Sequence, residues 1–137
     1  MTESCDVLLG SHMSISGGMP KSIDRGVSIG CTAIQVFVKG NTRWKFPPLK
    51  PADAELFQAN MAKSCVRSCI AHAIYLVNCA SNNPEFQQKS KDDLLDELER
   101  CDALGIPGLV LHPGAHMGDG LDVGIERIVN ALNGVFA

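Results

Sequence analysis

Four short apolar runs divide the chain, and each has the length of a β-strand. Five or six apolar residues are too few for a helix, and runs without strict polar alternation are typical of parallel strands covered on both faces. The pattern therefore predicts four parallel strands. They cover residues 6–10 (DVLLG), 33–38 (AIQVFV), 68–73 (SCIAHA) and 108–113 (GLVLHP).

Segments with a helical pattern follow each of these runs, at residues 19–30, 51–64, 83–105 and 122–136. The third is the clearest, because Asn83 can cap it and Pro84 fits its first position. Gly105 suits its end. The order β-α-β-α-β-α-β-α predicts an α/β fold of parallel βα repeats with helical crossovers. The apolar stripe of the third helix is expected to contain Leu94, Leu95, Leu98, Cys101 and Leu104.

Composition narrows the class of protein. A chain of 137 residues with 45% hydrophobic and 20% charged residues is typical of one globular domain. The net charge is −3, whereas proteins that bind nucleic acid are usually more basic, so any such contact must be local. One segment fits that requirement: residues 39–50 (KGNTRWKFPPLK) have no acidic residue. It carries Lys39, Arg43, Trp44, Lys45, Phe46 and Lys50.

The sequence also bears on the cell compartment. No apolar run approaches the roughly 18 residues that a membrane-spanning helix needs. The N-terminus (MTESCDVLLGSH) does not resemble a secretory signal, and the six cysteines form no C-x-x-C pair. Most of the cysteines have apolar neighbours, as reduced and packed thiols do. We therefore expect a cytoplasmic or nuclear protein with no membrane partner.

Three histidines, His12, His72 and His112, stand at the carboxyl ends of predicted strands. One such histidine is more often a structural residue, but the carboxyl ends of parallel strands meet at one rim. Imidazole is a frequent zinc ligand, so three at one rim favour a metal site. No acidic residue lies near His72. We expect Asp119 and Asp122, which follow His112, to be solvated loop or helix-start residues.

Aromatic and glycine-rich positions add a second kind of candidate chemistry. Packing in the core is the ordinary role of Tyr75 and Trp44. Beside Arg43, however, Trp44 is suited to stacking on a base or wedging into a DNA backbone. Residues 14–19 (SISGGM) form a possible tight turn before a helix N-terminus that can receive a phosphate. A solvated surface loop is the alternative for residues 39–50.

Four motifs in this order resemble the endonuclease IV family, also called AP endonuclease family 2, of xylose-isomerase-like TIM barrels. They are LLGSHMSISGG, FVKGNTRWKFPPL, HAIYLVNCA and ERCDALGIPGLVLHPGAH. The third fits a family signature, a histidine followed by a tyrosine three residues on and an asparagine six residues on. The resemblance implies a (β/α)8 barrel that uses three zinc ions to cleave the phosphodiester 5′ to abasic sites in double-stranded DNA.

Carried onto this sequence, the resemblance implies metal ligands at His72 and His112. It places His12 in the first glycine-rich loop, and we count it with the DNA-binding residues. Arg43, Trp44 and Tyr75 fall in loops that engage the damaged duplex. The later strands of the family barrel supply the carboxylates of the metal site, so the catalytic residues are unknown here.

A complete barrel has eight βα units in about 250 residues, whereas four units are predicted here. We therefore expect residues 1–137 to be the N-terminal half of a barrel with little or no nuclease activity. Its open strand edges are expected to self-associate or to pair with the missing half. Two alternatives remain open. One is a metal-dependent sugar isomerase or epimerase, and the other is a non-catalytic half-barrel that binds metal or DNA.

Overall fold

A computed structural model describes residues 7–137 and contains one sheet of four parallel strands. The strands are adjacent in chain order: β1 (Gly10–His12), β2 (Ala33–Val36), β3 (Ser68–His72) and β4 (Leu109–Val110). Four helices alternate with them: α1 (Pro20–Ser28), α2 (Pro51–Lys63), α3 (Pro84–Leu104) and α4 (Leu121–Val135). The α/β class and the order of its βα repeats, half of a TIM barrel, are confirmed.

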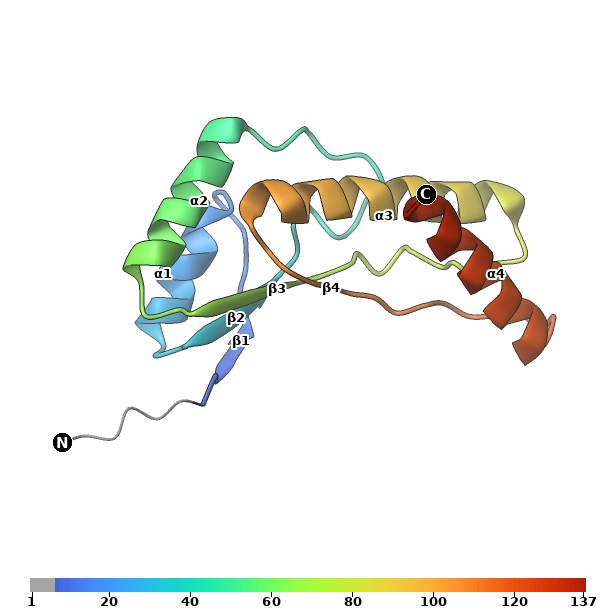
Figure 1. Ribbon diagram of the computed structural model, residues 1–137, viewed down its shortest axis with the longest axis horizontal. Coiled ribbons are helices and arrows are strands. Elements are labelled where there is room, and N and C mark those ends of the chain that lie inside the picture. The colour runs from blue at the N-terminus through green and yellow to red at the C-terminus, as the bar shows by residue number, and fades with distance from the viewer. Residues whose placement is uncertain (1–6) are drawn as a thin grey trace.

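The helices lie together on one side of the strands, and within residues 7–137 the other side carries none (Figure 1). Side chains that alternate along the strands explain this arrangement. Val36 on β2 and Ala71 on β3 point to the helices and are fully buried, together with Phe57 of α2. On the opposite face, Ile70 and Val110 keep 39% and 41% of their surface exposed. The sheet therefore has one packed face and one open face.

Local signals set the ends of α3 as predicted. The side chain of Asn83 accepts hydrogen bonds from the backbone N–H groups of Glu85 and Phe86. Pro84 occupies the first helical position. Gly105 ends the helix with φ of 68°, in the left-handed region that glycine adopts without a steric penalty. These three residues fix a helix of 21 residues between β3 and β4.

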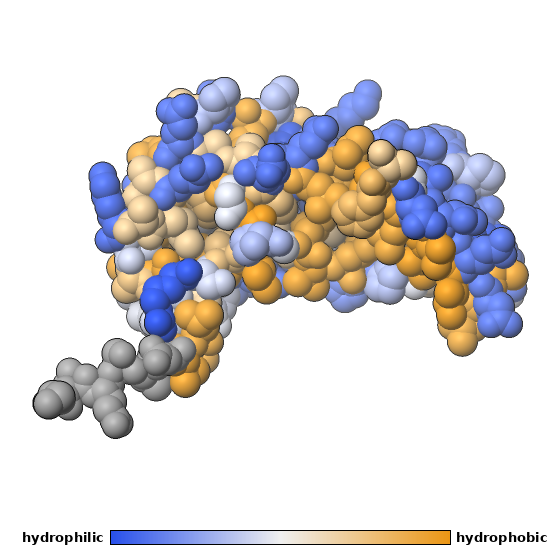
Figure 2. All heavy atoms as spheres, viewed as in Figure 1, coloured by the Kyte–Doolittle hydropathy of each residue, from blue (hydrophilic) through white to orange (hydrophobic). Residues whose placement is uncertain are grey.

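The first strand differs from its prediction. It begins at Gly10 rather than at residue 6, because Gly10 is the first residue that pairs with β2, opposite Ala33. The apolar side chains before it, at Val7, Leu8 and Leu9, are more than half exposed. Figure 2 shows apolar surface beside the grey N-terminal residues. The start of the predicted strand, Asp6, lies outside the described residues, as do Cys5 and the first half of the N-terminal segment that does not resemble a secretory signal.

The apolar stripe predicted for α3 is partly wrong. Leu94, Cys101 and Leu104 are buried as expected, but Leu95 is 47% exposed. Three ionisable residues of the same helix are buried as well: Asp93, Glu97 and Arg100. Buried ionisable groups require partners. Asp93 and Arg100 are paired with the segment between β2 and α2, and Glu97 accepts a hydrogen bond from Ile74, which follows β3. The inner face of α3 therefore carries an ionic cluster in addition to its apolar contacts.

Five cysteines fall within residues 7–137, and all of them are free thiols. Cys65 is exposed, whereas the other four are buried. Burial raises the pKa of Cys69 and of Cys101 to about 12. Over the same residues, no helix combines the length and the apolar character needed to cross a membrane.

Replacing Gly10 with alanine is expected to destabilise the fold. A β-carbon at Gly10 would overlap the carbonyl oxygen of Ala33, so β1 and β2 would have to separate locally. We expect a loss of about 1–3 kcal/mol in the free energy of unfolding, measured by urea denaturation. Gly134→Ala in α4 is the control, because nothing lies within 4 Å of its added carbon. Equal stability of the two variants would contradict this account of β1.

Candidate metal and nucleic-acid site

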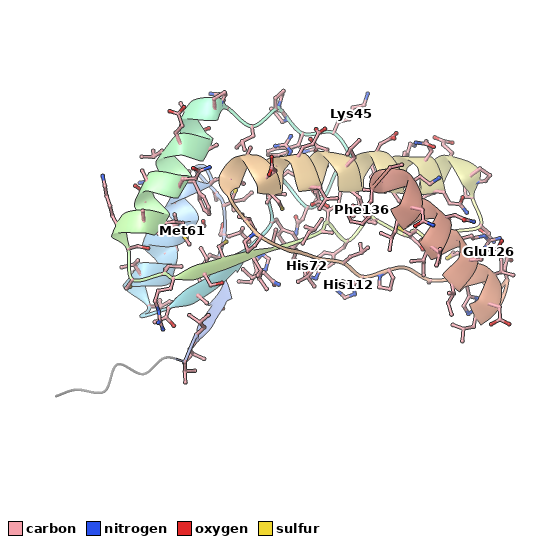
Figure 3. All side chains as sticks on the ribbon, in the orientation of Figure 1. Lys45, Met61, His72, His112, Glu126 and Phe136 are labelled. Atoms are coloured by element: carbon pink, nitrogen blue, oxygen red, sulfur yellow. The ribbon has the colours of Figure 1, made fainter. Side chains whose placement is uncertain are left out.

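Aromatic rings gather on the open face of the sheet at the carboxyl ends of the strands. His72 and His112 lie side by side, with ring centroids 5.0 Å apart (Figure 3). Tyr75 lies 5.5 Å from His72 and 6.1 Å from His112. His12 joins them through Phe37, whose ring lies 4.5 Å from His12 and 5.8 Å from His72. The three histidines predicted to meet at one rim therefore do so.

Strand geometry produces this convergence. His12 and His72 are the last residues of β1 and β3, and His112 comes two residues after the end of β4. In the parallel register His72 is opposite Val110, so both side chains lie on the same face of the sheet. His112 is two residues after Val110, and residues two apart on a strand point to the same face, so its ring faces the same side as that of His72. Alternation thus places all three imidazoles on the face without helices.

His72 is oriented for binding through one ring nitrogen. The residue is 9% exposed, and its Nδ1 lies 2.7 Å from the carbonyl oxygen of Ala73. A carbonyl only accepts, so Nδ1 carries the proton and Nε2 of the neutral ring keeps its lone pair. A histidine fixed in this way by a backbone carbonyl is typical of metal ligands.

The donor set near His72 fits part of a zinc site. Two neighbouring imidazoles are nitrogen ligands that zinc prefers. Over residues 7–137, however, no three histidine, cysteine, aspartate or glutamate side chains come together in a way that could hold a metal ion. The first two acidic residues after His112 lie elsewhere: Asp119 pairs with Arg127, and Asp122 is exposed in the first turn of α4.

The candidate DNA-contacting residues differ in exposure. Tyr75 is 67% exposed although its ring edge packs on Phe37. Arg43 is exposed, and its guanidinium lies 5.9 Å from the centroid of the Phe46 ring. Trp44 is half-buried, because its ring packs edge-on against Phe86 of α3 at 5.2 Å. Tyr75 and Arg43 are therefore available to a ligand, whereas only part of the Trp44 ring is.

Lys39 does not belong to the exposed basic segment in which the sequence placed it. Its side chain is buried, and its ammonium lies 2.5 Å from Asp93 and 2.9 Å from Asp96. It also donates a hydrogen bond to the carbonyl oxygen of Trp44 at 3.3 Å. Burial alone would lower the pKa of Lys39, but the hydrogen bonds to the two aspartates outweigh it and raise that pKa. The ammonium is thus a structural cation.

Glu97 lies next to this ion pair and is fully buried. It accepts a hydrogen bond from the backbone N–H of Ile74 at 3.2 Å. Burial, and then the negative charge of Asp93, raise the pKa of Glu97 to about 8. Burial also raises the pKa of Asp93. Glu97 is therefore mainly a neutral acid at neutral pH.

Asn78 is a site residue whose role the sequence did not reveal. Its Oδ1 accepts hydrogen bonds from the backbone N–H groups of Ala80 and Ala115, both at 3.0 Å. Its Nδ2 donates to the carbonyl oxygen of Ala115 at 3.1 Å. The side chain therefore joins the segment after His72 to the segment after His112. Its place in the HAIYLVN motif was the only signal. Phe37 was missed as well, although its parity with Gln35 puts it on the open face.

Comparisons with known proteins bear on the fold and the family of the chain. Residues 23–137 match the family model described as xylose isomerase-like TIM barrel. A probable endonuclease 4 of Geobacter sp. (strain M21) is 46% identical over 129 residues, which are 94% of this chain and 46% of the relative. A probable endonuclease 4 of Citrifermentans bemidjiense is 45% identical over 130 residues, or 95% of this chain and 46% of that relative.

Two solved structures resemble this chain over about half of their own length. The crystal structure of endonuclease IV from Thermus thermophilus aligns with a TM-score of 0.77 and 30% identity, covering 94% of this chain and 48% of that one. A D-tagatose 3-epimerase-like protein aligns with a TM-score of 0.64 and 15% identity, covering 93% of this chain and 47% of the other, so it shares the fold alone. The chain spans about half the length of the curated relatives it matches.

Proposed function

Because the chain belongs to the xylose isomerase-like TIM barrel family, we propose that it is part of a zinc-dependent endonuclease for DNA repair. The reaction is cleavage of the phosphodiester 5′ to abasic sites in double-stranded DNA. One observation carries the proposal: two adjacent imidazoles stand beside an exposed tyrosine at the mouth of the half-barrel. Identity of 46% to a probable endonuclease 4 supports it.

Each candidate residue has a distinct role in this proposal. His72 and His112 hold zinc, with His72 binding through the nitrogen that Ala73 leaves open. A bound zinc ion supplies a Lewis acid and lowers the pKa of a bound water. Arg43 contacts a phosphate, and Tyr75 stacks in the space left by the missing base.

Two further residues complete the proposed DNA contact. His12 is exposed at the end of β1, with Nδ1 3.0 Å from Oε1 of Gln35, which sets the plane of its ring. Its imidazole lies on the open face of the sheet, over which the duplex would lie. The exposed part of Trp44 contacts the same strand as Arg43.

The length of the chain bears on its activity. The chain spans 46% of the matched relatives, so we propose that residues 1–137 are the N-terminal half of the barrel. In that arrangement the other half supplies the carboxylates and covers the open strands. We expect the 137-residue chain alone to have little or no nuclease activity, and to pair with the other half-barrel or with itself.

Binding to damaged DNA tests the proposal directly. We expect the zinc-loaded chain to bind a duplex containing an abasic-site analogue more tightly than the intact duplex, measured by fluorescence anisotropy. Tyr75→Ala is expected to lower the affinity for the abasic duplex about tenfold, which is the contribution of one stacking contact. Arg43→Ala is expected to lower the salt dependence of binding by about one phosphate contact.

Lys21→Ala is the matched control, because Lys21 is an exposed cation on α1, which lies on the other side of the sheet. It is expected to leave both quantities unchanged. If the chain binds both duplexes equally and Tyr75→Ala has no effect, the proposed DNA contact is wrong. Tight binding of a small sugar at the same face would instead support the isomerase or epimerase alternative.

A further inference from the structure

Two loops of the proposed site are attached to the same turn of α3. Lys39, at the start of the loop of residues 39–50, pairs with Asp93 at 2.5 Å. Ile74, in the loop of residues 73–80, donates its backbone N–H to Glu97 at 3.2 Å. Asp93 and Glu97 are four residues apart on one helix, so their side chains share a face. The two carboxyl groups are also within hydrogen-bonding reach of each other.

One unpaired atom identifies how the two carboxyl groups interact. Among the described residues, Oδ2 of Asp93 is the buried side-chain oxygen without a hydrogen-bond partner. Such an atom is costly unless a donor reaches it. A protonated Glu97 supplies that donor, and its other oxygen still accepts from Ile74. The shift of the pKa of Glu97 to about 8 agrees with this assignment.

The loop of residues 39–50 depends on these contacts for its position. It contains no helix or strand before Pro51. Its attachments to α3 are the Lys39 ion pairs, the hydrogen bond from Arg100 to the carbonyl oxygen of Pro47 at 2.8 Å, and the packing of Trp44 on Phe86. Arg100 in turn binds Asp96 at 3.0 Å. The ionic cluster of α3 therefore sets where Arg43 lies.

We propose that Lys39, Asp93 and Glu97 form a bridge through α3 that holds the loops of residues 39–50 and 73–80 in register with each other. They are positioning residues, because all three are buried on the helix side of the sheet, away from the open face that carries the histidines. The bridge fixes the spacing between Arg43 and Tyr75, and hence the fit to a bent duplex. This last step rests on the proposed function, whereas the coupling of the two loops does not.

Trp44 allows the coupling to be measured without DNA. It is the only tryptophan of the chain, and its carbonyl oxygen accepts from Lys39. Glu97→Ala removes the hydrogen-bond donor to Asp93 and the acceptor for the backbone N–H of Ile74. It changes no residue in the loop of residues 39–50, which contains Trp44. We expect a shift of the fluorescence maximum of Trp44 and easier quenching by acrylamide. Glu97→Gln keeps one donor and one acceptor, so it is expected to restore the wild-type spectrum.

Two further variants show whether a change in the spectrum reflects the bridge or a general loss of structure. Glu99→Ala changes an exposed glutamate of the same helix and is expected to leave the spectrum unchanged. If Glu97→Ala does not fold, as judged by circular dichroism, Asp96→Asn replaces it. Asp96 is 40% exposed and binds Lys39 and Arg100, so its loss is expected to shift the spectrum in the same direction but less.

The dependence on pH provides an independent readout. The groups that face Glu97 are Asp93, Lys39 and Cys101. The pKa of Cys101 is about 12, and Lys39 is held charged by its aspartates, so neither changes charge near pH 8. Wild-type Trp44 fluorescence is expected to change as the pH rises through about 8. That change is expected to be absent in Glu97→Gln.

The outcomes separate this inference from the proposed function. An unchanged Trp44 spectrum in both folded variants, Glu97→Ala and Asp96→Asn, would overturn the bridge, as would an equal pH response in Glu97→Gln. A shifted spectrum together with about tenfold weaker binding to the abasic duplex supports both. A shifted spectrum in a protein whose wild type binds no DNA supports the bridge and contradicts the proposed function.

Discussion

Replacing His72 with alanine is expected to weaken zinc binding by the chain at least about a hundredfold. The imidazole is held with one nitrogen on Ala73 and the other open beside His112. Competition with a zinc-binding dye measures the affinity. His116→Asn is the control, because His116 uses Nδ1 to accept from the backbone N–H groups of Gly118 and Gly120, and an asparagine oxygen can replace it.

The same zinc complex should depend on pH. A protonated imidazole cannot bind a metal ion, so zinc should leave as the pH falls through the range in which histidines become protonated. Retention of zinc in acid, or equal affinities for the His72→Ala and His116→Asn variants, would exclude His72 as a ligand. Loss of affinity in both His72→Ala and His112→Ala would instead support a shared site.

The second large effect is expected at Lys39. Lys39→Met removes the cation that two aspartates share and leaves the buried carboxyl group of Asp93 without its partner. Breaking a buried ion pair in this way costs about 3–5 kcal/mol, which urea denaturation would measure. Lys45→Met, at an exposed lysine of the same loop, should change stability by less than about 0.5 kcal/mol.

A double variant tests the physical reason for that loss. Lys39→Met combined with Asp93→Asn removes both buried charges, and it should be more stable than Lys39→Met alone. If the double variant loses the sum of the two single losses, the Lys39–Asp93 pair does not couple. If the losses are not additive, the difference is the coupling energy of the pair and measures how strongly the loop is held to α3.

Much of the fold is encoded locally and could be predicted. The apolar runs gave the strands, and Asn83, Pro84 and Gly105 gave the ends of α3. Strand limits were less accurate, because a strand extends only as far as its partner. β1 starts at Gly10 since that residue pairs with Ala33, 23 positions away in the sequence. No pattern within the first ten residues contains that information.

In the candidate site, too, some features could be predicted from local sequence and others depend on distant partners. Histidines at strand ends could be predicted to converge, because parallel strands share a direction. The pairing of Lys39 with Asp93 could not, because a lysine among arginine and proline residues is typical of an exposed segment. Its partner lies 54 positions away, on a helix face predicted to be apolar. Polar residues paired over such a distance leave no periodic signal in either segment.

The distribution of thiols has a consequence for how the protein responds to oxidants. Thiolate is the form that reacts, and the high pKa values of Cys69 and Cys101 keep both thiols protonated. Their burial also keeps both side chains away from peroxides in solution. Cys65 is the exposed thiol within residues 7–137, and it lies between α2 and β3, at the end of the sheet opposite the histidines. Sulfenic acid formed at Cys65 would therefore leave the imidazoles untouched.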